Sequence, residues 1–243
     1  MTRATRIAAT LAVALGAPAV LADTARAQTS VFWTDWTAST LLGGNTGTAT
    51  GTVNVDGTDV GVAYSGEIDF TQTSGGTNYF QPRSTFLGAL LTDGSPITSD
   101  MIAISGRDIS STFTFSAPIV DPFISFVSVG RTSVTVTYTF DAPFTIVAGG
   151  PSSVFGGVPI TQSAPNVMVG NEGNGTIRFS GTFTSLTFTA TGNEYWHSFT
   201  IGVAGVDDGL PPPNVVPEPS TVSLLALGLA GLGVAARRRR KGA

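Results

Sequence analysis

Cysteine is absent from the 243-residue chain, and His197 is its only histidine. The first absence excludes disulfides, thiol nucleophiles, iron–sulfur clusters and cysteine-bound zinc. The second excludes a metal site built from several histidines and leaves one imidazole for general base catalysis. The fold must therefore be stabilised by packing, and we expect no cofactor.

Basic residues are scarce in the central part of the chain, from residue 28 to residue 215. This part has no lysine, and its basic residues are Arg83, Arg107, Arg131 and Arg178. Of the 16 acidic residues only Asp23 and Glu218 lie outside it, which leaves 14 against 4 and a net charge of about −10. Nucleic-acid binding needs clustered Lys and Arg to neutralise phosphates. We therefore expect no nucleic-acid partner.

The C-terminal end of the sequence combines a proline motif, an apolar segment and a basic cluster. Pro217, Glu218 and Pro219 precede an apolar segment over residues 222–236. The basic cluster that follows consists of Arg237, Arg238, Arg239, Arg240 and Lys241. A helix over the apolar segment spans roughly 22 Å, short of the ~30 Å hydrocarbon core of a bilayer. The positive-inside rule holds the basic cluster in the cytoplasm and leaves the preceding chain outside.

This tail resembles the PEP-CTERM sorting signal, in which a Pro-Glu-Pro motif precedes a short membrane segment and an arginine cluster. The resemblance implies that residues 216–243 are a sorting signal, that an exosortase is the processing partner, and that the 222–236 helix contacts the membrane before processing. A permanent anchor that is never cut and a C-terminal core helix are the alternatives. The signal implies export across the inner membrane, transient anchoring, and delivery to the cell surface or extracellular matrix.

Residues 1–27 have the organisation of a signal peptide. Two arginines lie in the first six residues, an apolar segment rich in alanine covers residues 7–22, and Ala25 and Ala27 place small residues before a cleavage site. An earlier cut after Ala22 is the alternative. Both ends of the sequence are therefore set apart from the globular domain, which we expect over residues 28–206.

The globular domain shows the two-residue period of β-strands. Val134, Val136, Tyr138 and Phe140 alternate with threonines, so the apolar side chains share one face and the threonines share the other. Similar runs recur along the domain and are separated by Gly, Asn, Asp and Pro clusters typical of turns. The pattern predicts an all-β fold, a two-sheet antiparallel β-sandwich of jelly-roll type, followed by a Pro-rich linker over residues 207–215.

Two candidate catalytic segments argue against an enzyme. Glu67-Ile68-Asp69 resembles the start of the catalytic strand of laminarinase-type glucanases, but Gln72 stands where that family has its second glutamate. Retaining hydrolysis needs two carboxyl groups, so the resemblance implies no activity. The alternation predicts Glu67 and Asp69 as an exposed acidic pair, with Ile68 and Phe70 in the core. His197 is in register with core-facing residues, which favours a structural histidine bonded to a backbone carbonyl over a base assisted by Glu194.

Oxygen-bearing side chains between Asn54 and Asp59, with contributions from residues 171–174 or 207–208, suggest a calcium site. The Asp56-Gly57 pair explains the first cluster equally well as a hairpin turn, and we expect no metal. Aromatic residues that offer faces for stacking sugars are Trp33, Trp36, Tyr79, Tyr195 and Trp196. The alternative is that these rings fill the core or its rim. An acidic domain favours a neutral polysaccharide over an anionic one.

These observations predict an exported protein of the cell surface or the exopolysaccharide matrix, a biofilm component with a non-catalytic structural or adhesive role. The alternative is a lectin-like glycan-binding module or a glycoside hydrolase on a jelly-roll fold. The structural role predicts isolated carboxylates and buried tryptophans, whereas the alternative needs an open cleft with paired carboxylates or exposed rings.

Overall fold

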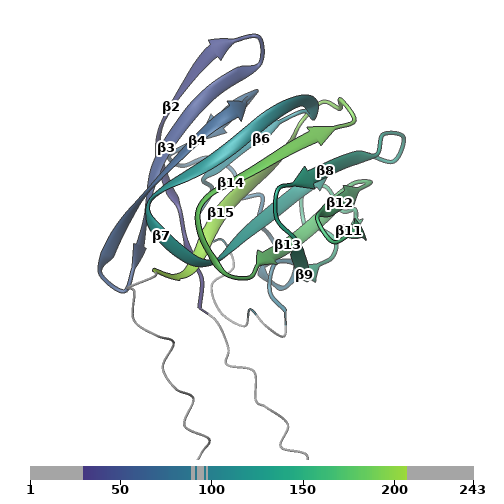
Figure 1. The fold of residues 1–243 in the computed structure, drawn as a ribbon. Helices are drawn as coiled ribbons and strands as arrows, with labels where there is room; N and C mark the ends of the chain where they lie inside the picture. The colour runs from purple at the N-terminus through teal and green to yellow at the C-terminus, as the bar shows by residue number, and fades with distance from the viewer. Residues whose placement is uncertain (1–29, 89–90, 92–95, 97, 207–243) are drawn as a thin grey trace, which may run out of the picture.

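The computed structural model describes residues 30–88, 91, 96 and 98–206 (Figure 1). These residues form fifteen β-strands and one short 3₁₀-helix, η1 (Arg83–Thr85). Within this part of the chain no helix is long and apolar enough to span a bilayer. The predicted signal peptide, the 207–215 linker and the 222–236 membrane segment lie outside the described residues.

The long strand β7 (Arg107–Val129) organises the fold, because its two halves pair with different neighbours. The strands that extend from its first half are β2 (Asp35–Gly43), β3 (Thr46–Val55), β4 (Thr58–Glu67), β8 (Val136–Phe140), β11 (Thr161–Ala164), β12 (Val167–Gly170) and β14 (Thr182–Thr191). They follow the order β2-β3-β4-β7-β14-β8-β12-β11, and every pair is antiparallel. We call this set the first half-sheet.

The second half of β7 belongs to a different set of ladders, which we call the second half-sheet. Its other strands are β1 (Phe32–Trp33), β5 (Phe70–Gln72), β6 (Met101–Ile104), β9 (Phe144–Gly149), β10 (Val158–Pro159), β13 (Gly173–Phe179) and β15 (His197–Val206). The main order is β5-β6-β15-β7-β13-β9, with β1 beside β15 and β10 parallel to β13.

The main core lies between the two half-sheets and is rich in aromatic rings. The Phe113 ring from the first half of β7 lies 5.8 Å from that of Phe199 on β15, and the Phe126 ring lies 5.1 Å from that of Tyr138 on β8. The predicted all-β, antiparallel architecture is confirmed. Two separate jelly-roll sheets stay a prediction, since the ladders join all strands in one connected sheet through β7 (Figure 1).

The two-residue period holds within strands and fails where the chain changes half-sheet. On β8 the side chains of Val136, Tyr138 and Phe140 are buried, as the alternation predicts. Between β4 and β5, in contrast, the chain leaves the first half-sheet and enters the second, so the alternation is not continued. The core position predicted for Ile68 is confirmed, since it is 2% exposed, but the predictions for Glu67 and Phe70 are wrong: Glu67 is fully buried, whereas Phe70 is 37% exposed.

Candidate functional site

The acidic pair predicted at the end of β4 is not isolated. The buried Glu67 carboxylate accepts hydrogen bonds from the backbone N–H groups of Ser105 and Arg107, at 2.9 and 3.0 Å. The Arg107 guanidinium lies 3.1 Å from Glu67 and 2.6 Å from Asp69, and the Ser105 hydroxyl donates to Asp69. Every carboxylate oxygen of Glu67 is thus used to hold β4 to the chain that enters β7.

Gln72 has an equally structural environment. Its side-chain amide donates to the backbone carbonyls of Thr77 and Ser99, at 3.1 and 2.8 Å, and so ties β5 to two loops. An amide cannot act as the proton donor that glycoside hydrolysis requires, and Glu67 is occupied by Arg107. The geometry at these residues therefore lacks the two free carboxyl groups of a glycosidase.

The only histidine lies in a sealed network inside the main core. The His197 side chain is fully buried, with Nδ1 2.7 Å from the Glu194 carboxylate and Nε2 2.6 Å from the Tyr138 hydroxyl. Glu194 also accepts a hydrogen bond from the backbone N–H of Gly130 at 2.6 Å. The predicted core position is correct, but the predicted backbone-carbonyl partner is wrong. Burial raises the pKa of Tyr138 well above its ordinary value, which keeps this hydroxyl neutral.

A second carboxyl pair was not predicted from the sequence, because its two residues are far apart in the chain. Asp100, which immediately precedes β6, is 6% exposed and lies against Asp35 at the start of β2. Burial, with hydrogen bonding and repulsion from the Asp35 carboxylate, raises the pKa of Asp100 to about 6. The pair joins the first half-sheet to the second at one end of β2.

The oxygen-rich segment near Asp56 is a hairpin turn between β3 and β4. Asp56 and Gly57 both have positive φ, at 48° and 90°, as a two-residue type I′ turn requires. The Asn54 side chain accepts from the backbone N–H of Gly57 at 3.0 Å and donates to Asp59. Among the described residues, no group of three or more His, Asp or Glu side chains is placed to hold a metal ion. Residues 207 and 208 lie outside the described part.

The five predicted sugar-stacking residues lie in four different places, and only two of them come together. Trp36 is fully buried in the main core, where its indole N–H donates to the Thr200 hydroxyl at 3.2 Å, and Trp33 is half-buried beside a small cluster around Phe123. Tyr79 and Trp196 do come together, with ring centroids 5.5 Å apart. Tyr195 is 80% exposed, and the Arg131 guanidinium lies 4.6 Å from its ring centroid.

Tyr79 and Trp196 belong to a half-buried aromatic cluster on the second half-sheet. Phe70 and Phe155 complete it, with ring centroids 5.1 and 5.5 Å from Trp196. Tyr79, Phe155 and Trp196 pack on four buried residues: Phe80, Phe86, Met101 and Val127. Phe70 and Phe155 were missed because one was assigned to the core and the other lies in a loop. The rings mainly contact one another, which supports the expectation of a core rim.

The first half-sheet presents an outer face of hydroxyl side chains, which we call the hydroxyl face. It comprises Thr48 and Thr50 on β3, Ser65 on β4, Thr112 and Thr114 on β7, Thr139 on β8, and Ser185, Thr187 and Thr189 on β14. Cross-strand pairing aligns them in rows, one of which runs Thr48, Ser65, Thr112, Thr187. The hydroxyls of Thr112 and Thr187 lie 3.1 Å apart. No member of the hydroxyl face is charged.

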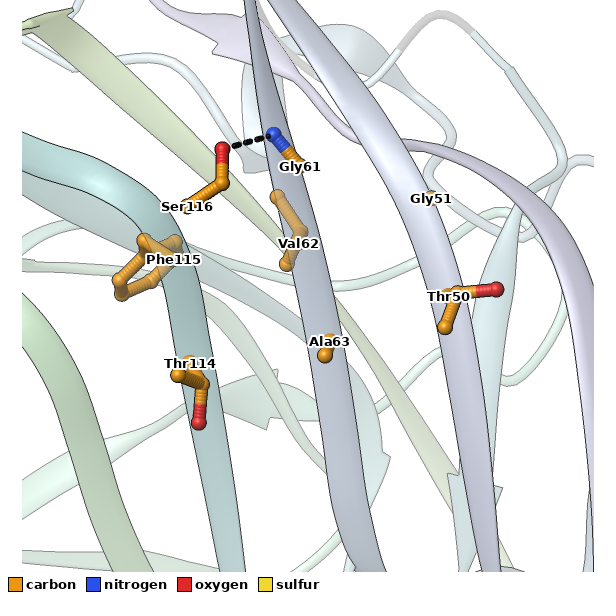
Figure 2. Close-up of a pocket in the computed structure, with 8 residues that line it drawn as sticks. All are labelled: Thr50, Gly51, Gly61, Val62, Ala63, Thr114, Phe115 and Ser116. Carbon is orange, nitrogen blue, oxygen red and sulfur yellow. Dashed lines mark hydrogen bonds between the residues drawn. The ribbon is translucent and has the colours of Figure 1, made fainter.

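Two shallow hollows lie on the hydroxyl face. Figure 2 shows how Thr50, Ala63 and Thr114 lie side by side on β3, β4 and β7, so that the small alanine forms the floor between two threonines. Gly61 extends the floor, and its backbone N–H donates to the Ser116 hydroxyl at 2.7 Å (Figure 2). The hollows have volumes of about 330 and 510 Å³ and share these three side chains. They are open, uncharged and without a catalytic group.

Comparison with known proteins identifies the C-terminal signal and leaves the globular domain without a match. The chain carries a PEP-CTERM protein-sorting motif at residues 215–240, which confirms the predicted sorting signal. The motif implies export and exosortase processing toward the cell surface. No curated protein and no solved structure significantly matches the chain.

Proposed function

We propose that this protein is a non-catalytic component of the cell surface or the exopolysaccharide matrix, which an exosortase delivers and which adheres to neutral polysaccharide through its hydroxyl face. The observation that carries the proposal is the combination of a sorting motif at residues 215–240 with an uncharged, ordered hydroxyl surface on the domain. The destination supplies a polysaccharide-rich environment, and the face supplies matching hydrogen-bonding groups.

The chemistry of the hydroxyl face suits a neutral polymer. Each Thr or Ser hydroxyl both donates and accepts hydrogen bonds, as sugar hydroxyls do. The hydroxyl groups repeat about every 4.8 Å from strand to strand and about every 6.7 Å along a strand. Threonine side chains have few χ1 rotamers, so they lose little conformational entropy when they contact a polymer. Anionic polymers would be repelled by the central part of the chain, residues 28–215, which has a net charge of about −10.

A non-catalytic role agrees with the use of the titratable groups. Glu67 and Asp69 are held by Arg107, and Glu194 and His197 are buried against each other. Enzymes instead keep catalytic acids and bases within reach of a substrate. Adhesion through many weak hydroxyl contacts needs no such group.

The proposal is tested by measuring how the mature protein, recovered after export, binds to insoluble neutral glucan and to the neutral exopolysaccharide of its host. Thr114→Glu places a negative charge in the shared floor of the hollows, and we expect at least a tenfold loss of binding. Ser133→Glu adds the same charge at an exposed position outside the hydroxyl face and serves as the matched control. Equal binding by the two variants would contradict an adhesive hydroxyl face.

The aromatic cluster favours a second candidate function, a lectin-like glycan site. The supporting observation is the 80% exposure of Tyr195 next to the half-buried Trp196. Sugar rings stack on such side chains, although Arg131 already covers one face of Tyr195. Tyr195→Ala would abolish glycan binding if this site is the functional one, and would leave it unchanged if the hydroxyl face is.

A further inference from the structure

Two long stretches of this strongly acidic domain have no charged side chain, residues 36–55 and residues 142–171. The first is flanked by Asp35 and Asp56 and folds as the β2–β3 hairpin, whose turn at residues 43–45 consists of two glycines and an asparagine with positive φ. Two copies of this protein that meet at this hairpin bring no like charges together there.

Strand β2 lies at the edge of the first half-sheet (Figure 1). It pairs with β3 on one side, and none of the other described strands pairs with it on the other. Every residue from Thr37 to Gly43 is exposed. Leu41 and Leu42, at 59% and 66%, are the most exposed large aliphatic side chains of the described residues.

The edge of β2 has few of the features that usually prevent edge-to-edge pairing. Such features are lysines, prolines, strong bulges and covering segments. Beyond Asp35 the strand has no charge and no proline, and its register shifts fall near its two ends, leaving Ala38 to Leu41 regular. The nearby strand β5 contacts β2 on its inner face. Ser39 on β2 pairs with the buried Ala49 on β3, so its side chain points to the inner face. The Ser39 Oγ lies 2.6 Å from Thr71 Oγ1 on β5.

We infer that β2 is a self-association strand that pairs antiparallel with β2 of a second copy to form a two-fold symmetric dimer. Antiparallel pairing of one strand with itself is self-complementary, as a two-fold interface requires. It satisfies the free backbone N–H and C=O groups of both edges and covers the exposed leucines. The uncharged hairpin lets two acidic domains approach without bringing their carboxylates together.

The dimer extends the first half-sheet across both copies. Each hydroxyl face lies on this half-sheet, so pairing through β2 joins two such faces into one larger surface. A flat polymer would then meet twice as many hydroxyl rows, and two linked weak sites bind more tightly than one. Self-association goes beyond the proposed adhesion and is measured without any polysaccharide.

Light scattering of the mature protein, recovered after export, tests the inference by measuring its mass over a range of concentrations. We expect the wild-type mass to double as concentration rises, and Leu42→Lys to remain monomeric. Val158→Lys is the matched control, because Val158 is 50% exposed on β10, and we expect it to dimerise normally. A wild-type protein that is monomeric at all concentrations, or a Leu42→Lys variant that dimerises like Val158→Lys, would overturn the inference.

A disulfide cross-link locates the interface. The chain has no cysteine, so Thr40→Cys introduces a single thiol into the regular segment from Ala38 to Leu41. In antiparallel self-pairing only the residues at the two-fold axis lie next to their own copies, and pairing through this segment places the axis at Ser39 and Thr40. Oxidation should therefore give a covalent dimer, whereas Val158→Cys should not. A dimer that forms without cross-linking through Thr40→Cys uses another surface and contradicts β2 pairing. A wild-type protein that dimerises through β2 but binds no neutral polysaccharide would reject only the adhesive proposal.

Discussion

The two halves of β7 are buried in different ways, although they belong to one strand. In the first half, from Arg107 to Val120, buried residues such as Phe113 and Phe115 alternate with the exposed Thr114 and Ser116. In the second half every residue from Pro122 to Val129 is buried. The first half-sheet thus leaves one face to solvent, whereas the second half-sheet is covered on both.

This difference indicates that the second half-sheet mainly stabilises the fold, whereas the first half-sheet is accessible to partners. The outer side of the second half-sheet is covered by loops that carry Phe80, Phe86 and Leu91, and some of its buried polar groups bond to one another and to these loops. Ser125, for example, lies 2.8 Å from the Thr176 hydroxyl, which also donates to the backbone carbonyl of Phe86 at 3.1 Å. A ligand can reach the hydroxyl face without displacing any structure, which is why we assign adhesion to the first half-sheet.

Breaking the buried polar network around His197 should have the largest effect on stability. Glu194→Ala leaves His197 Nδ1 and the Gly130 N–H without their partner in the sealed core. Two unsatisfied buried groups should lower the free energy of unfolding by about 3 kcal/mol. Urea unfolding measures the loss. Glu172→Ala, which removes a more exposed carboxylate bonded to Ser128, is the control, and an equal loss in both would contradict a special role for the buried network.

Removing the cation between the two half-sheets should have the next largest effect. Arg107→Met leaves the buried Glu67 carboxylate without its counter-ion, while its two backbone donors remain. Because Arg107 is partly exposed, we expect a loss of about 2 kcal/mol rather than the 3–5 kcal/mol of a fully buried pair. Adding Glu67→Gln to this variant should restore part of the stability. No recovery in the double variant would show that Arg107 contributes through packing alone.

Sequence patterns predicted the strands and failed at long-range pairings. The alternation around Tyr138 and the core register of His197 follow from local periodicity, which a strand imposes on neighbouring residues. The partners of Glu67 and Asp100 lie tens of residues away in the sequence, so the local period of a strand cannot predict them. The hydroxyl face was visible as outward threonines, but its rows depend on a strand order that one sequence does not contain.

The carboxyl pair at the start of β2 should make stability depend on pH. The folded pKa of Asp100 is raised from 3.8 to about 6, so the folded state binds this proton more tightly than the unfolded state. Its contribution to stability is fully present below about pH 3.8 and is lost as the pH rises through about 6. Asp100→Asn should therefore flatten the unfolding free energy over this window. An unchanged slope between wild type and variant would contradict the pairing with Asp35.

The smallest effect on stability is expected at the hydroxyl face. Thr114→Val keeps the shape of an exposed side chain on β7 and removes one hydroxyl, so the free energy of unfolding should change by no more than about 0.5 kcal/mol. Polysaccharide binding should nevertheless weaken measurably. A large loss of stability would mean that this face is structural, and the contrast between the two halves of β7 would disappear.

The most direct test of exosortase-dependent sorting is to measure the intact mass and the cellular fraction of the protein in its native host, with and without the exosortase. We predict a matrix form that lacks the basic cluster at residues 237–241 and is present only when the exosortase is active. A chain that keeps this cluster in the membrane in both strains would contradict sorting to the matrix and would make the protein a permanently anchored surface protein.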